Sequence, residues 1–273
     1  MIKEFLKYIS SVRGFSPCTC KAYERDLHHF VTWAHQNITG ARWSKISRED
    51  IDRYVEYYEE IGQKPATTNR RLSSIAGLYQ FMKRQGLAVE NPCRYESRRR
   101  VELTVPNTIP AEQLRTAYDH SIGVVRVMLG LLITSGIRIG ELMRLQYHDV
   151  DCINNTIKVH GKGAKERVIH IPAEQLAELK AVKEHCSVNG TIFTIPERLA
   201  RKMIHDALKP YCDAPQLSPH AIRHTFATNQ ALRGANVTTI ATTLGHNHIE
   251  TTQKYINLAE AVSSTHTIKN SIL

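Results

Sequence analysis

The 273-residue sequence has no run of about eighteen consecutive apolar residues, the minimum for a membrane-spanning helix. Residues 1–14 have the apolar spacing of an amphipathic helix rather than the pattern of a signal peptide. The six cysteines show no paired Cys-x-x-Cys spacing, which disfavours both a disulfide framework and a zinc site. No internal repeat or low-complexity tract is present. These absences predict a cytoplasmic globular protein with reduced cysteines.

Motifs of two large enzyme classes are also missing. The sequence has no Gly-x-x-x-x-Gly-Lys-Ser/Thr loop to hold a nucleotide. It has no His-Glu-x-x-His motif and no aspartate cluster to hold a metal. The sequence therefore gives no reason to expect a nucleotide-driven enzyme or one of the common metallohydrolases.

What the chain does have is positive charge. Its formal net charge is +10, and its isoelectric point is near 9.4. Residues 1–100 hold 18 Lys and Arg against 11 Asp and Glu, so they carry +7 and the remaining residues carry +3. An excess of this size suggests a polyanionic partner such as nucleic acid.

Residues 1–95 have the periodicity of four helices and contain no convincing strand. Ser16-Pro17 is a start signal for the second helix, and Ser47 with Asp50 has the spacing of a capping box for the third. The fourth is expected from about Thr67 to Gln85, before Gly86. Its polar and basic side chains are candidate phosphate contacts, with a solvated basic face as the alternative; they are Lys64, Thr67, Thr68, Asn69, Arg70, Arg71, Lys83 and Arg84.

Residues 96–109 combine an arginine run with proline and lack a helical period, which predicts an extended basic linker between two domains. The second domain is then residues 110–273. Its first part is expected to be helical from Pro110 to Ser135 and to end at Gly136. Short strands are expected at 147–150, 156–160 and 167–171, with a glycine-rich hairpin between the last two. Helices are expected after Pro172 and over about 197–212, and the apolar run at 191–195 suggests a further strand.

The most informative stretch runs from His220 to Tyr255. Ser218-Pro219 predicts a helix start that places His220 and Arg223 one turn apart on the same face. A glycine then breaks the pattern in Leu-Gly-His, and Tyr255 follows His246 by nine residues. A lone histidine or tyrosine on such a helix is most often structural. The ordered set is what indicates phosphate chemistry.

His-x-x-Arg followed by Leu-Gly-His and a tyrosine nine residues on resembles the C-terminal motif of the tyrosine recombinase (phage integrase) family. The segment TSGIRIGELMRL resembles the family's first arginine motif, and SPCTCKAYERDL with TTNRRLSSIAGLYQFM resembles the N-terminal domain of its short Xer-type members. The resemblance implies a mainly α (α+β) fold. Its parts are a four-helix SAM-like core-binding domain and a helical catalytic domain with a small three-stranded antiparallel sheet.

The resemblance also assigns roles. Its catalytic set is Arg138, Lys162, His220, Arg223, His246 and Tyr255. Tyr255 is the implied nucleophile, the two arginines clamp the phosphate, Lys162 is the implied general acid and His220 the general base. Lys165 is a rival acid on the same hairpin. Glu141 is expected to orient a catalytic residue or merely to pair along its helix. His224 and His248 are expected to be structural or to support the site from outside.

These roles imply a site-specific recombinase that cuts and rejoins double-stranded DNA at paired sites through a covalent 3′-phosphotyrosyl intermediate. Because that intermediate conserves the bond energy, neither a metal nor a nucleotide cofactor is expected. The tail at 258–273 resembles the segment by which such enzymes dock on a neighbouring protomer in a tetrameric synapse. The alternatives are a type IB topoisomerase-like enzyme, a DNA-binding protein that does not cut, and a metallohydrolase built on His220, His224, His246 and His248.

Overall fold

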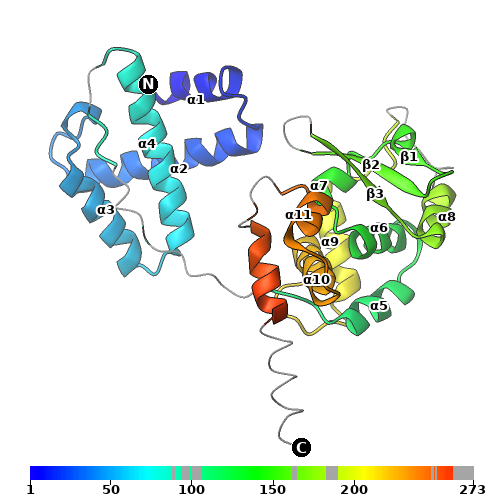
Figure 1. The fold of residues 1–273 in the computed structure, drawn as a ribbon. Helices are drawn as coiled ribbons and strands as arrows, with labels where there is room; N and C mark the ends of the chain where they lie inside the picture. Colours follow the sequence, from blue (N-terminus) through cyan, green and yellow to red (C-terminus); the bar gives the residue numbers. More distant parts are fainter. Residues whose placement is uncertain are drawn as a thin grey trace, which may run out of the picture. The chain divides into compact units, whose positions relative to one another are not determined.

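A computed structural model of the chain describes residues 1–87, 90–93, 99, 106–161, 165–182, 190–246, 249 and 251–260. The chain divides into two compact units, Met1–Glu102 and Leu103–Leu273, each with its own hydrophobic core (Figure 1). Within the described residues no helix is long and apolar enough to cross a bilayer.

The N-terminal unit is helical throughout its described part, as the sequence predicts. Its elements are α1 (Ile2–Ser11), α2 (Pro17–Asn37), the short 3-10 helix η1 (Trp43–Lys45), α3 (Arg48–Glu60) and α4 (Pro65–Arg84). Ser16 caps α2, with proline in its first turn, and Ser47 and Asp50 form the predicted capping box of α3. Helix α4 begins at Pro65, slightly before the predicted start, because this proline also occupies a first helical turn.

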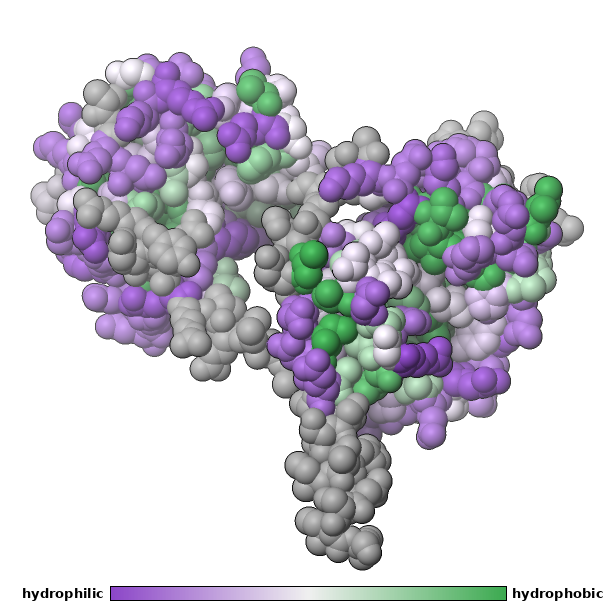
Figure 2. Space-filling view, viewed as in Figure 1, coloured by the Kyte–Doolittle hydropathy of each residue, from purple (hydrophilic) through white to green (hydrophobic). Residues whose placement is uncertain are grey.

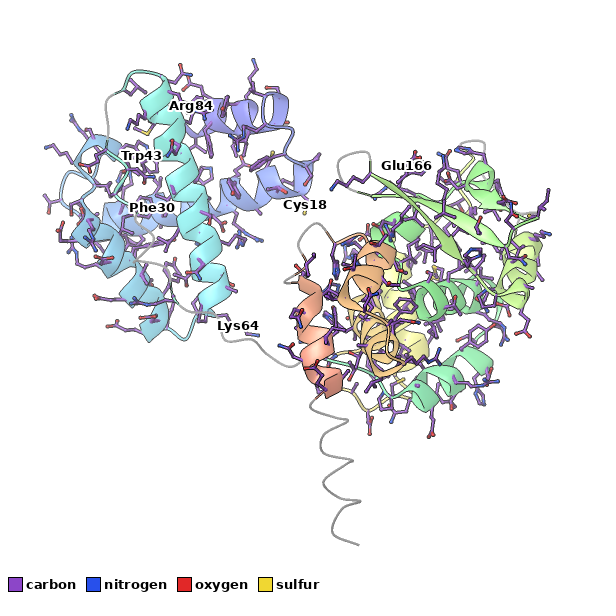
Figure 3. All side chains as sticks on the ribbon, viewed as in Figure 1. Cys18, Phe30, Trp43, Lys64, Arg84 and Glu166 are labelled. Atoms are coloured by element: carbon purple, nitrogen blue, oxygen red, sulfur yellow. The ribbon has the colours of Figure 1, made fainter. Side chains whose placement is uncertain are left out.

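The core of this unit lies where α2 and α4 pack against each other and against α1 and α3. Aromatic side chains dominate it, and Tyr54 and Tyr79 have no exposed surface. Phe30 meets the Tyr54 ring edge-on at a centroid distance of 5.0 Å, and it lies near Trp43 within the helices (Figure 3). Hydrophilic residues cover most of the face of this unit that Figure 2 shows. Burying one such aromatic ring stabilises the fold by about 1.5–3 kcal/mol.

The C-terminal unit combines helices with a small sheet, which confirms the expected fold class. Its elements are α5 (Ala111–Asp119), α6 (Gly123–Ser135), α7 (Ile139–Leu142), η3 (Tyr147–Asp149), β1 (Val150–Asp151), β2 (Thr156–His160), β3 (Glu166–His170), α8 (Ala173–Val182), α9 (Glu197–Leu208), α10 (Pro219–Leu232) and α11 (Val237–Leu244). Residues 251–260 form a further helix, drawn red in Figure 1.

Helix α6 is the centre of this unit. It is apolar on all sides, with Met128, Leu129, Leu131 and Leu132 fully buried. Four helices, α5, α8, α9 and α10, pack around it. The sheet has the order β1-β2-β3 with both pairings antiparallel, and β2 and β3 form the predicted hairpin. The hairpin is closed by a bond from the Gly161 amide to the Lys165 carbonyl, 2.7 Å long.

Three sequence expectations about this unit were wrong. The strand expected at 147–150 is the 3-10 helix η3, whose turn is closed by a bond from the Gln146 backbone amide to the Asp149 carboxylate, and only Val150 of that range lies in β1. The helix expected over 110–135 is two helices, α5 and α6, because the chain turns at His120–Ile122 before restarting at Gly123, whose φ is +55°. The strand expected at 191–195 is only an isolated bridge between Thr191 and Gln146. Ile192 and Phe193 in that run are buried in the core, so its apolar character reflects packing rather than strand pairing.

The predicted linker is attached at both ends to the unit on that side. Asn69 on α4 holds the backbone of Arg99 with two hydrogen bonds of 2.7 and 2.9 Å, and the Arg99 guanidinium pairs with Glu59. Ile109 is buried, and its amide and carbonyl both bond to the Thr225 hydroxyl on α10. The rest of the predicted linker, at 96–98 and 100–105, lies outside the described residues.

Candidate active site

Arg138 is the N-cap residue of α7 and Glu141 lies in its first turn, shortly after the left-handed Gly136 that ends α6. The carboxylate of Glu141 accepts bonds from the Arg138 backbone amide at 3.0 Å and from its Nη1 at 2.9 Å. Arg138 Nη2 donates to the Gly245 carbonyl at 3.2 Å. Glu141 therefore fixes both the helix start and the direction of the Arg138 side chain.

Glu141 also holds a second arginine that sequence reasoning missed. Arg167 on β3 donates to both Glu141 oxygens, at 2.7 and 3.1 Å, and its Nε donates to the Thr243 carbonyl at 2.8 Å. Burial alone would raise the pKa of Glu141, but the bonds from Arg167 and Arg138 lower it to about 2. The available signal was strand alternation, since Arg167 shares a strand face with the buried Ile169.

Arg223 is the most deeply buried of the predicted cationic residues, with 2% of its surface exposed. Its Nη1 donates to the Gly136 carbonyl and its Nη2 to the Leu244 carbonyl, both at 2.7 Å. These carbonyls lie at the C-terminal ends of α6 and α11, where backbone acceptors lack helical donors. Burial, reinforced by the nearby charge of Arg138, lowers the pKa of Arg223 to about 9, so the guanidinium remains charged at neutral pH.

The two predicted catalytic histidines approach the arginines from α10 and from the turn after α11. His220 is exposed on the first turn of α10, which Ser218 caps as predicted. His246 is half-buried, and its Nδ1 lies 2.7 Å from the hydroxyl of the buried Thr252. Burial and the charge of Arg223 lower the pKa of both imidazoles, that of His246 to about 4. Both histidines are therefore neutral at physiological pH.

These side chains line one cavity of about 970 Å³ within the C-terminal unit. Residues from α7, α10 and the turn after α11 meet there, so the structure brings together Arg138, His220, Arg223 and His246. Lys165, at the base of the hairpin, also lines the cavity. Lys162, the predicted general acid, lies outside the described residues, as do His248 and the tail at 261–273. The assignment of Lys162 as the general acid stays a prediction.

Tyr255 lies beside this cavity but is not part of its lining. Only 2% of its surface is exposed, and its ring packs with Ala227, Ile240 and Leu244. Its hydroxyl lies 2.6 Å from Nδ1 of His224 on α10. Burial raises the pKa of Tyr255 to about 12, although Arg223 and Arg138 oppose the shift. The phenol is thus protonated and held away from the cavity.

His224, expected only to support the site, is therefore in direct contact with the predicted nucleophile. Its ring also meets the ring of His220, with centroids 4.5 Å apart. Burial, and after it the neighbouring His220, lowers the pKa of His224 to about 4. A neutral imidazole accepts the phenol hydrogen without drawing it into an ion pair. The sequence signal was weak, because the two residues are 31 positions apart.

The predicted DNA-contacting residues of α4 do not form one surface. Lys64 precedes the first turn and Arg84 ends the last, and Figure 3 shows them at opposite ends of the helix. A helix of 20 residues is about 30 Å long, so one phosphate cannot contact both ends. Lys64, Lys83 and Arg84 are exposed, and Arg84 also contacts the Tyr8 hydroxyl.

The middle of α4 faces inward. Arg71 is 7% exposed, and its guanidinium lies 4.1 Å from the centre of the Tyr58 ring, a cation–π contact. This position corrects the expectation that Arg71 contacts phosphate, because the side chain belongs to the core of the unit. Arg70 pairs with the buried Asp26 and Asn69 with the Arg99 backbone. Thr67 remains half-buried and Thr68 is buried, so the exposed lysines are the better candidates.

The helical N-terminal unit is followed by a unit in which two arginines and two histidines line one cavity and a tyrosine is buried beside it. This is the arrangement of a tyrosine recombinase. The chain belongs to the phage integrase family, whose model matches residues 107–261, while the model of the phage integrase N-terminal SAM-like domain matches residues 2–86.

Relatives of similar length match over nearly the whole chain. Tyrosine recombinase XerC of Lactobacillus delbrueckii subsp. bulgaricus is 30% identical, covering 94% of each chain. XerC of Halalkalibacterium halodurans is 28% identical over 95% of this chain and 93% of its own. XerD of Oceanobacillus iheyensis is 26% identical over 95% of this chain and 94% of its own.

Solved structures share the fold. The XerH site-specific recombinase in its post-cleavage complex with a palindromic difH substrate superposes with a TM-score of 0.77 at 16% identity, covering 99% of this chain and 85% of that one. The Tn1549 transposon integrase bound to a circular intermediate DNA gives 0.71 at 19% identity, covering 93% and 94%. The chain is accordingly a DNA strand transferase of the tyrosine recombinase class.

Proposed function

We propose that this recombinase cuts and rejoins double-stranded DNA at paired recombination sites, acting in the cytoplasm as a tetramer that forms on the DNA. The observation that carries the proposal is the convergence of Arg138, His220, Arg223 and His246 on one cavity, although the chain separates the first from the last by more than a hundred residues. The XerH and Tn1549 structures with DNA substrates support a duplex as the ligand.

Arg138 and Arg223 are the proposed clamp for the scissile phosphate. A guanidinium is planar and stays charged, so it suits the non-bridging oxygens of a phosphodiester. Both arginines are already held in place, Arg138 by Glu141 and Gly245, and Arg223 by two backbone carbonyls. Little ordering of these side chains remains to be done when DNA binds, which favours electrostatic stabilisation during the reaction. His246 would add a hydrogen bond to the same phosphate.

Tyr255 is the proposed nucleophile, attacking the phosphorus to form a 3′-phosphotyrosyl bond while the 5′ oxygen leaves. In the structure its hydroxyl is bonded to His224, outside the cavity lining. The helix of residues 251–260 must therefore shift before attack. His220, exposed at the cavity and neutral, is the proposed base that accepts the phenol proton.

Lys162 is the proposed acid that protonates the departing 5′ oxygen, with Lys165 as the rival. The β2–β3 hairpin carries both, and its base lies at the cavity through Lys165. The covalent intermediate keeps the energy of the broken bond, so rejoining needs only the reverse transfer and no nucleotide. The tail beyond residue 260 is the proposed docking segment between protomers.

A nicked duplex tests the proposal, because loss of the short fragment beyond the nick prevents rejoining and traps the adduct. Binding sites are first selected from random duplexes with the full-length Tyr255→Phe variant. Wild type should then form a covalent adduct on these sites, and Tyr255→Phe should bind equally well and form none. Tyr211→Phe, another tyrosine of the same unit, is the matched control and should form adduct normally. Adduct on Tyr255→Phe would reject Tyr255 as the nucleophile.

A further inference from the structure

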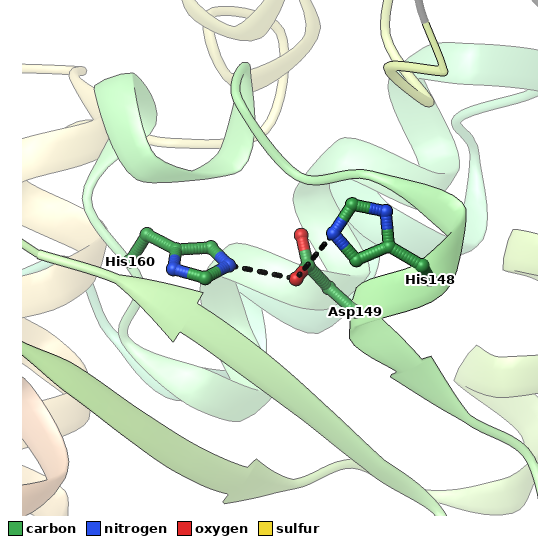
Figure 4. Close-up of side chains that lie close together, drawn as sticks. All are labelled: His148, Asp149 and His160. Atoms are coloured by element: carbon green, nitrogen blue, oxygen red, sulfur yellow. Dashed lines mark hydrogen bonds and ion pairs between the residues drawn. The ribbon is translucent and has the colours of Figure 1, made fainter.

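Three potential metal ligands, two from η3 and one from the end of β2, lie close together in the C-terminal unit (Figure 4). Asp149 at the end of η3 is 3% exposed, and its Oδ2 accepts the Gln146 amide at 3.0 Å. Its other oxygen, Oδ1, lies 2.8 Å from Nε2 of His160 on β2 and 3.6 Å from Nε2 of His148. Two imidazole nitrogens thus point at one carboxylate oxygen.

His160 has a carboxylate at each of its ring nitrogens. Nδ1 lies 3.1 Å from Oε1 of Glu166, its cross-strand partner on β3, while Nε2 faces Asp149. A neutral imidazole carries one N–H, so it donates to only one of the two. When Nδ1 donates to Glu166, Nε2 presents its lone pair to the carboxylate oxygen of Asp149. Two facing lone pairs repel at 2.8 Å, and a cation bound by both atoms removes that repulsion.

We propose that His148, Asp149 and His160 form a site for a zinc-class divalent metal ion, with water completing the coordination. Nitrogen and carboxylate ligands of this kind suit Zn²⁺ better than Mg²⁺ or Ca²⁺. The three ligand atoms lie within 4.8 Å of one another, and ligands on one zinc ion are separated by about 3–4 Å. The His148 side chain is 73% exposed, so few packing contacts restrict the movement of its ring toward the other two ligands.

Glu166 completes the arrangement expected around a metal-binding histidine. Such a histidine usually donates its second N–H to a carboxylate, which fixes the tautomer and strengthens the ligand. The ion would join η3 to β2 and, through Glu166, to β3 at the base of the hairpin that carries Lys162 and Lys165. The ion has a structural role, holding the hairpin to η3, and takes no part in strand transfer.

The test is calorimetric titration of ZnCl₂ into the full-length, metal-free protein at neutral pH. Wild type should bind one equivalent at this site, and His148→Ala and His160→Ala should each weaken binding at least tenfold. Glu166→Gln should weaken it by roughly tenfold or more, as loss of such an outer carboxylate does. His170→Ala, an exposed histidine on the same strand as Glu166, is the matched control and should bind like wild type.

Cobalt(II) provides a second readout, since its visible spectrum reports the ligand geometry. Wild type should give a spectrum that one equivalent of zinc abolishes and that excess Mg²⁺ leaves unchanged. Failure of wild type to bind zinc, or equal affinity in wild type and His160→Ala, would overturn the proposal and leave a protonated His160 bridging two carboxylates. Circular dichroism of each variant checks that it is folded, so that a lost site is distinguished from a lost fold.

Discussion

The hydroxyl of Tyr255 and Nδ1 of His224 lie 2.6 Å apart, inside a small apolar cluster beside the arginine-lined cavity. The shifted pKa values keep both groups neutral, that of Tyr255 at about 12 and that of His224 at about 4. A phenol in this state is a poor nucleophile. If Tyr255 is the nucleophile, as proposed, the contact describes a resting enzyme in which the phenol must leave His224 before it reacts.

The first prediction tests that contact. His224→Ala leaves the buried phenol without a partner and should lower the free energy of unfolding by about 1–3 kcal/mol. His224→Asn, which places an acceptor in a similar position, should recover part of the loss. In the Tyr255→Phe background, His224→Ala should lower the free energy of unfolding distinctly less, because the Tyr255–His224 hydrogen bond is already absent. A double-mutant cycle by urea denaturation gives the coupling, and a coupling near zero would argue against the bond.

The rate of adduct formation shows whether His224 only holds the Tyr255 hydroxyl at rest or also takes part in catalysis. If the hydroxyl leaves His224 before attack, His224→Ala should form the covalent adduct at least as fast as wild type on a nicked substrate. His220→Ala, the proposed base, should slow it by roughly 10²–10⁴-fold. A comparable loss for His224→Ala would instead make His224 the residue that accepts the proton.

The second prediction concerns Glu141. Because Arg167 and Arg138 hold the pKa of Glu141 at about 2, below its usual 4.5, its contribution to stability is complete above pH 4.5 and is lost as the pH falls toward 2. Glu141→Gln should lower the free energy of unfolding by roughly 3 kcal/mol at neutral pH, since it leaves the largely buried Arg167 and the partly exposed Arg138 without their counter-ion. Glu197→Gln, whose pair with Arg201 is exposed, should change it by less than about 1 kcal/mol. Chemical denaturation at pH 7 and pH 3 measures both effects, and the deficit of Glu141→Gln relative to wild type should be smaller at pH 3, where part of the contribution of the carboxylate is already lost.

A third prediction isolates the general acid. Lys162→Ala should slow cleavage of an ordinary phosphodiester by roughly 10²–10⁴-fold. A substrate with sulfur at the bridging 5′ position releases a thiolate and does not need the proton, so it should restore the variant nearly to the wild-type rate. Arg223→Ala should stay slow on both substrates, because its proposed contacts are to non-bridging oxygens. Restoration of Lys165→Ala instead would transfer the role to Lys165.

The fourth prediction contrasts two basic residues of α4. Lys64 is exposed and Arg71 is buried against Tyr58. If Lys64 contacts a phosphate, Lys64→Ala should reduce the slope of log affinity against log salt by about 0.9 and leave stability unchanged. Arg71→Ala should lower stability and leave that slope unchanged. Fluorescence anisotropy over a salt series measures these slopes. Equal slopes for Lys64→Ala and wild type would show that Lys64 contacts no phosphate and is only a solvent-exposed side chain.

Local chemistry is what made parts of this structure predictable. Ser16, Ser47 and Ser218 mark helix starts because a cap involves only its own first turn. The break between α5 and α6 was missed because apolar spacing continues through it, and only Gly123 marks the restart. Arg167 was missed, and the contact between His224 and Tyr255 was not foreseen, because the partners lie 26 and 31 positions apart in the sequence. The inward direction of Arg71 depends on a helix register that periodicity did not fix.

Because Glu141 is shared between two arginines, it also sets the net charge that meets the phosphate before and during the reaction. Arg138, Arg167 and Arg223 carry three positive charges, and Glu141 removes one, so these groups leave a net charge of two. A phosphodiester carries a single negative charge, whereas its pentacoordinate form carries two. Neutral histidines add nothing to either sum. In the proposed role of these arginines as the phosphate clamp, the charge of these four side chains matches that of the pentacoordinate form better than that of intact DNA, which is the condition for lowering a barrier rather than merely tightening binding.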